Sequence, residues 1–169
     1  MRHHSILAAI AALALACTRG ARTEQVLTEL PLDSLDQVIG KTGVTLDPAV
    51  SFDGRGSLRL AAAEPTTFRV AELAIPPVDG VRLIYRARVR SEDVRGKAYL
   101  EMWCAFPGQG EFFSRALQSP LSGTNDWTTQ ETPFFLQKGQ VPSRVKLNLV
   151  VEGTGTVWLD QVVLAEAPL

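Results

Sequence analysis

Residues 81–90, VRLIYRARVR, alternate between two kinds of side chain. The odd positions are apolar, and the even positions are mostly basic: Val81, Leu83, Tyr85, Ala87 and Val89 against Arg82, Ile84, Arg86, Arg88 and Arg90. A period of two is typical of a β-strand with one buried and one wetted face, because successive side chains of a strand point to opposite sides. The segment therefore predicts a strand whose odd residues enter the core.

The same alternation returns in residues 97–106 and 144–152. Their inward residues are expected to be Ala98, Leu100, Met102, Cys104 and Phe106 in the first, and Val145, Leu147, Leu149 and Val151 in the second. On this face Cys104 is predicted to be a small buried hydrophobe rather than a reactive thiol. Shorter candidate strands, separated by turn residues, are 57–60, 68–75, 112–117, 128–137 and 156–165.

Helical periodicity is weak throughout, and only residues 32–39 are expected to form a short helix. Many short strands with frequent turns predict an all-β fold, an antiparallel β-sandwich in which each strand sends alternate side chains into a common core.

The N-terminus predicts a targeting segment. A short positive start, Met1-Arg2-His3-His4-Ser5, precedes an apolar run too short to span a bilayer, which indicates a signal peptide over residues 1–16. Its junction, Leu13-Ala14-Leu15-Ala16-Cys17, resembles that of bacterial lipoprotein precursors, which implies lipidation of Cys17 and a membrane-anchored protein of the cell envelope.

The residue that follows, Thr18, is no aspartate, and this implies the outer membrane if the cell is Gram-negative. Ala14 and Ala16 also satisfy an Ala-x-Ala cleavage rule, so a secreted or periplasmic form is the alternative. Residues 17–26 are expected to form a tether, and residues 27–169 the folded domain.

Removal of this leader would also remove residue types that many catalytic mechanisms and metal sites require. Both histidines, His3 and His4, lie inside it, and with Cys17 acylated the only thiol left is Cys104. The mature protein would then have no disulfide, no Cys/His zinc site and no histidine for Ser-His-Asp or Cys-His catalysis. Loss of Arg2, one of 17 basic residues against 18 acidic ones, leaves a net charge of about −2, which does not favour nucleic acid as a partner.

Four motifs occur in an order that resembles one group of proteins: 53–60 (DGRGSLRL), 85–90 (YRARVR) with Gly96 shortly after, 126–128 (DWT) and 153–164 (GTGTVWLDQVVL). The group is the jelly-roll carbohydrate-binding modules of the galactose-binding-like superfamily, especially families 4, 9 and 22. The resemblance covers about residues 27–164. It implies a jelly roll and a non-catalytic domain that binds glycan.

The resemblance also implies a structural calcium ion, with Asp160 of the last strand as a ligand. An acidic partner is expected from Glu29, Asp47 or Asp53, whereas Gln161 stands where the group often has a second acidic residue. Calcium is bound by several carboxylate and carbonyl oxygens, so such a site is chemically reasonable. The alternative is that Asp160 caps or salt-bridges near the sandwich edge. No other cofactor is expected.

If the three patterned strands share one sheet, as the resemblance implies, one outer face collects the candidate ligand-binding residues Tyr99, Trp103, Arg86, Arg88, Glu101 and Asn148, with Lys146 and Glu152. Aromatic rings stack on the C–H face of sugars, and planar polar groups pair with hydroxyls. Tyr99 and Trp103 would lie about 13 Å apart at the usual strand rise, within the span of a short oligosaccharide.

Other interpretations of this face stay open. Arg86, Arg88 and Arg90 beside Glu101 and Glu152 would also suit cross-strand ion pairs on a solvated surface, and residues 107–120 would be long enough to cover Trp103. The protein would then be a structural envelope lipoprotein that docks on another protein. A glycan hydrolase that uses Glu101 and Glu152 is disfavoured, because neither lies in a recognisable catalytic motif.

Overall fold

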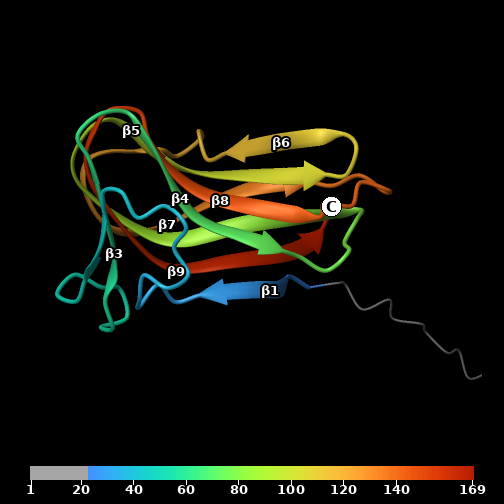
Figure 1. Ribbon diagram of the computed structural model, residues 1–169, viewed down its shortest axis with the longest axis horizontal. Helices are drawn as coiled ribbons and strands as arrows, with labels where there is room; N and C mark the ends of the chain where they lie inside the picture. Colours follow the sequence, from blue (N-terminus) through green and yellow to red (C-terminus); the bar gives the residue numbers. More distant parts are fainter. Residues whose placement is uncertain (1–22) are drawn as a thin grey trace, which may run out of the picture.

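A computed structural model describes residues 23–169, which form nine β-strands and no helix (Figure 1). The predicted signal peptide, Cys17 and most of the predicted tether lie outside these residues. Within 23–169 there is accordingly no helix long and apolar enough to cross a membrane. The strands are β1 (Gln25–Leu30), β2 (Val44–Asp47), β3 (Ser57–Ala62), β4 (Thr66–Ala74), β5 (Val81–Phe106), β6 (Gly110–Arg115), β7 (Leu121–Phe135), β8 (Arg144–Val151) and β9 (Thr154–Pro168).

The strands form one continuous antiparallel sheet that folds over itself into two layers. The long strand β5 belongs to both. Its first half, 81–92, pairs with β7 and β9, and its second half, 98–105, pairs with β6 and β8. Strands β1 and β3 extend the first layer from β9, and β4 extends the second layer from β8. The predicted antiparallel sandwich is confirmed.

The passage between the layers is a bend at residues 92–97. Asp93 and Gly96 have positive φ angles of 51° and 106°, and the pairing with β9 shifts between Glu92 and Arg95. Glycine suits position 96 because a Cβ there would lie 3.0 Å from the carbonyl oxygen of Glu152. The backbone conformation at this position is also strained for other residues. The bend places the two strongest strand patterns of the sequence on different layers.

The core lies between the two layers and contains every residue that the alternation predicts to be inward on 81–90, 97–106 and 144–152. Cys104 is fully buried there, and this burial raises the pKa of its thiol to about 12, as expected for an inert core cysteine.

The prediction of a short helix at 32–39 is wrong. These residues form turns, with Leu32 at a φ of 64° and buried, and Val38 closing one turn onto the carbonyl of Leu35. A positive φ at Leu32 cannot start a right-handed helix.

Candidate functional site

The candidate site lies on the outer face of the second layer, where side chains of three neighbouring strands form two rows. Glu101 of β5 pairs in register with Asn148 of β8 and Arg115 of β6, and Trp103 pairs with Lys146 and Phe113 on the same two strands. Residues that pair across a sheet point to the same side. These side chains together are called the Trp103 face: Glu101, Trp103, Phe113, Arg115, Lys146 and Asn148.

The Glu101 carboxylate organises the first row and is only 4% exposed. One oxygen accepts hydrogen bonds from Trp103 Nε1 at 2.7 Å and Asn148 Nδ2 at 3.0 Å, and the other accepts one from Arg115 Nε at 2.7 Å. Burial by itself would raise the pKa of Glu101, but the three hydrogen bonds outweigh burial and lower it. Glu101 is therefore an ionised anchor. The general acid of a glycosidase needs the opposite, a raised pKa.

Two aromatic rings form the apolar part of the face. Trp103 is partly exposed and Phe113 is 50% exposed, with ring centroids 4.9 Å apart and planes inclined at 45°. The Arg115 guanidinium lies 4.4 Å from the Phe113 ring centroid. Because the indole N–H of Trp103 is bonded to Glu101, the orientation of its ring is set before any ligand arrives.

Beside Trp103 the surface is hollowed. The hollow measures about 380 Å³ and is open to solvent, and Thr67, Arg69 and Glu111 complete its wall. Lys146 Nζ contacts both carboxylate oxygens of Glu111, at 2.6 and 2.8 Å. Aromatic surface with amide, hydroxyl and charged groups around it is the chemistry that sugar hydroxyls and C–H faces require.

Tyr99 is not part of the exposed surface, contrary to expectation. Only 2% of it is exposed, and its hydroxyl donates to Glu152 Oε1 at 2.9 Å. Burial, and then this hydrogen bond, raise the pKa of Tyr99 to about 12. The chain after β6 runs alongside, since Ala116 N–H donates to the carbonyl of Leu100 and residue 121 pairs with residue 98. The second exposed ring is Phe113 instead.

Arg86 and Arg88 are also not part of the Trp103 face. They lie on the outer side of the first layer, so the expectation that all three patterned strands share one face is wrong, because of the bend at 92–97. Arg86 forms ion pairs with Glu24 at 2.7 Å and Glu131 at 3.0 Å. Arg88 lies 4.3 Å from the ring centroid of Phe52. For Arg86 the ion-pair alternative holds, with different acidic partners from those expected.

Phe113 and Arg115 were missed from the sequence, although a signal existed. Pro107-Gly108-Gln109-Gly110 joins β5 to β6 as a tight connection, with Gln109 N–H bonded to the carbonyl of Phe106. A hairpin at these residues places 113 opposite 103. Part of the segment 107–120, which is long enough to cover Trp103, instead extends the sheet beside it as β6.

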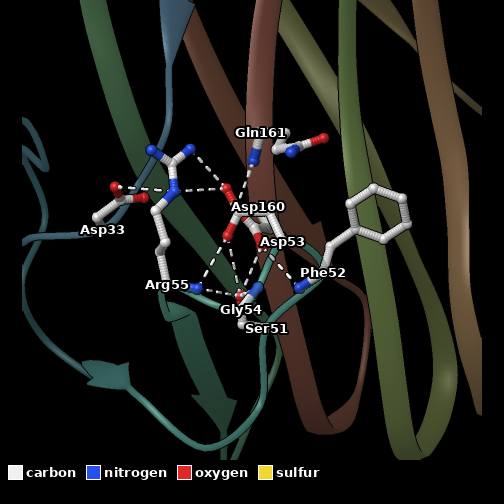
Figure 2. Close-up of polar contacts among 8 residues, drawn as sticks. All are labelled: Asp33, Ser51, Phe52, Asp53, Gly54, Arg55, Asp160 and Gln161. Carbon is white, nitrogen blue, oxygen red and sulfur yellow. Dashed lines mark hydrogen bonds and ion pairs between the residues drawn. The ribbon is translucent and has the colours of Figure 1, made fainter.

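Asp160, the predicted calcium ligand, is fully buried on β9 (Figure 2). Its carboxylate accepts hydrogen bonds from the backbone N–H groups of Phe52 and Gln161, both at 2.8 Å. Burial, outweighing these bonds, raises its pKa. Of the three expected acidic partners, Asp53 lies in the same cluster, Asp47 accepts a hydrogen bond from Trp158 Nε1 at 2.9 Å, and Glu29 is exposed on β1.

Solved structures of carbohydrate-binding modules have a similar fold. The CBM22-1 xylan-binding domain of Paenibacillus barcinonensis Xyn10C superimposes with a TM-score of 0.59 at 11% identity, covering 88% of this chain and 99% of that one. The C-terminal family 22 carbohydrate-binding module of Clostridium thermocellum Xyn10B gives 0.59 at 13% identity, over 84% and 94% of the two chains. This chain has the jelly-roll fold of carbohydrate-binding modules.

A Family 16 Carbohydrate Binding Module-2 shares the fold more loosely, with a TM-score of 0.52 at 13% identity over 72% of this chain and 84% of that one. No family model matches the sequence, and no curated protein does. At these identities the likeness to carbohydrate-binding modules is one of fold, as the four sequence motifs predicted.

Proposed function

We propose that this protein is a non-catalytic glycan-binding lipoprotein of the cell envelope, and that the glycan lies across the Trp103 face. The observation that carries the proposal is the solvent-accessible pair of Trp103 and Phe113 beside the hydrogen-bonded Glu101. Exposed aromatic rings next to planar polar groups suit sugar recognition. The fold supports it too, because solved structures of similar architecture include a xylan-binding domain.

The ligand would stack a pyranose ring on Trp103 and meet polar groups of the hollow, such as Asn148 and Arg69, with its hydroxyls. Glu101 holds Trp103, Arg115 and Asn148 in place, so little side-chain freedom is lost on binding. An open hollow of about 380 Å³ suits a polysaccharide chain lying across the surface better than a small molecule enclosed by protein.

Anchoring is the second part of the proposal. An acyl chain on Cys17 would hold the sandwich close to the membrane through a short tether, in the outer membrane if the cell is Gram-negative. Metabolic labelling with a radioactive fatty acid tests this: the wild-type protein takes up label and Cys17→Ala does not. Unlabelled wild-type protein that is soluble outside the cytoplasm would favour the secreted alternative instead.

Glycan binding is tested with an array of plant and bacterial polysaccharides and the mature protein. Trp103→Ala should weaken binding at least about tenfold, equivalent to roughly 1.4 kcal/mol. The matched control is Trp127→Ala, because Trp127 lies against Phe52, with ring centroids 6.1 Å apart, at the Arg88 side of the first layer. Failure to bind any polysaccharide, or equal losses in the two variants, would contradict the proposal.

A docking protein without a sugar ligand is the second candidate, favoured by one observation. Phe112 and Phe135 are more than half exposed and line an open slot at the β6 end of the sandwich, separate from Trp103. Exposed aromatic surface is enriched at protein interfaces. A photo-crosslinking residue at position 135 that captures one defined envelope protein, while position 103 captures none and no glycan binds, would favour this function.

A further inference from the structure

The loop between β2 and β3 packs against the last strand at the place where the resemblance implies calcium (Figure 2). Ser51, Phe52, Asp53 and Arg55 of this loop lie close to Asp160 of β9. The Phe52 N–H bond to Asp160, at 2.8 Å, ties the loop to the strand across more than a hundred residues of sequence. The negative charges of this buried carboxylate and of its acidic neighbours repel one another, so the cluster is unfavourable unless a positive group lies nearby.

Arg55 supplies a positive charge at this cluster. Its Nε and Nη2 donate to Asp53 Oδ2 at 2.9 and 2.6 Å, and its Nε lies 3.7 Å from Asp33 Oδ2. Figure 2 shows the guanidinium lying between the side chains of Asp33 and Asp53. The hydrogen bond to Asp53 raises the pKa of Arg55, and the charges of Asp33, Asp53 and Asp160 raise it further. A guanidinium thus contacts two of the aspartates and is attracted by the third.

The donor set around Asp160 does not fit calcium. Calcium takes six to eight oxygen ligands that converge on one point. Here the carboxylate of Asp160 faces two backbone N–H groups, and Asp53 Oδ1 accepts from the Arg55 N–H at 3.0 Å and from the Ser51 hydroxyl at 3.1 Å. N–H donors repel a cation. In residues 23–169 no group of three or more acidic, histidine or cysteine side chains is arranged to hold a metal ion.

We propose that Arg55 is the built-in cation of this loop, and that it takes the place of the calcium ion that the resemblance implies. The guanidinium balances Asp53 and Asp33 directly and Asp160 at longer range, so the loop stays attached to β9 without a metal. This inference is independent of whether the Trp103 face binds glycan.

Thermal unfolding of the mature protein tests the proposal. An ion that binds only the folded state raises the Tm. Because we expect no calcium to bind, the Tm of the wild type should be the same in excess calcium chloride and in excess EDTA. Arg55→Gln should lower the Tm more than the control Arg144→Gln does. Arg144 is matched in exposure, 60% against 63%, but pairs with the single carboxylate of Glu72 at 3.0 Å.

A double variant separates charge balance from a general loss of contacts. Arg55→Gln with Asp53→Asn removes the uncompensated carboxylate as well, so it should recover part of the Tm that Arg55→Gln loses. Any of three results would overturn the proposal. These are a wild-type Tm raised by calcium, a loss for Arg55→Gln no larger than for Arg144→Gln, and a double variant no more stable than Arg55→Gln alone.

Discussion

Glu101 is the residue whose replacement tests the architecture of the Trp103 face most sharply. The change Glu101→Gln keeps the shape of the side chain and removes its charge. The buried carboxylate now accepts hydrogen bonds from Trp103, Asn148 and Arg115. In the variant the amide oxygen of Gln still accepts hydrogen bonds from Trp103 and Asn148. The amide NH₂ then faces the Arg115 guanidinium, which is also a donor, so that hydrogen bond is lost.

The change in the free energy of unfolding follows from the weakening of these three hydrogen bonds. Hydrogen bonds to a charged group contribute about 1.5–3 kcal/mol each, and neutral ones about 0.5–1.5 kcal/mol, so the bonds from Trp103 and Asn148 each weaken by about 1 kcal/mol. The Arg115 contribution is discounted to under about 1 kcal/mol because Arg115 is partly exposed and screened by solvent. The free energy of unfolding should fall by about 2–3 kcal/mol, or roughly 5–10 °C in Tm for a domain of this size.

Urea unfolding followed by tryptophan fluorescence measures this change directly. The control is Glu111→Gln on the same face, because Glu111 forms an ion pair with Lys146 but is exposed. An exposed pair is worth roughly 0–1 kcal/mol, so the control should be nearly neutral. A Glu101→Gln variant as stable as Glu111→Gln would refute the view that Glu101 anchors this face.

Three further outcomes are expected. The Cys104 thiol, buried and with its pKa raised to about 12, should react with a thiol reagent at pH 8 only as fast as the protein unfolds; rapid labelling of folded protein would contradict this. Gly153→Ala should prevent folding, because its Cβ would overlap the carbonyl oxygen of Arg95; a Tm near that of the wild type would show that the two backbone segments do not lie so close together. Arg55 holds the pKa of Asp53 at about 2, below its usual 3.8, so Asp53 contributes stability above pH 3.8 that is lost as the pH falls toward 2. Asp53→Asn should therefore flatten the acid limb of the stability curve, and an unchanged slope would count against the ion pair.

The strands and their inward faces could be predicted because alternation is a local property of the chain. Residues 81–90 and 97–106 carry the period of two clearly, and the structure buries the predicted side of each. Alternation does not say which strand lies beside which. The bend at Gly96, where a single long strand passes from one layer to the other, therefore separated Arg86 and Arg88 from the rest of the predicted site.

Exposure was the other property that local pattern could not supply. Tyr99 and Trp103 are both on the outward side of β5, yet the chain after β6 lies alongside Tyr99, which is buried, while Trp103 stays partly exposed. In the sequence Arg55 is recognisable only as part of a glycine-rich turn. Its contact with Asp53 and Asp33 depends on how that turn folds back, which no local sequence pattern encodes.

Contact between a glycan and Trp103 can be observed through the indole N–H signals of the tryptophans. The chain has three tryptophans, and in a ¹H–¹⁵N spectrum each gives one such signal. Titration with a soluble oligosaccharide of the best-bound polysaccharide should shift the Trp103 signal and leave those of Trp127 and Trp158 in place, because Trp127 lies on the other layer and Trp158 is buried. A spectrum in which no indole signal moves, or in which only Trp127 or Trp158 responds, would contradict glycan binding at the Trp103 face.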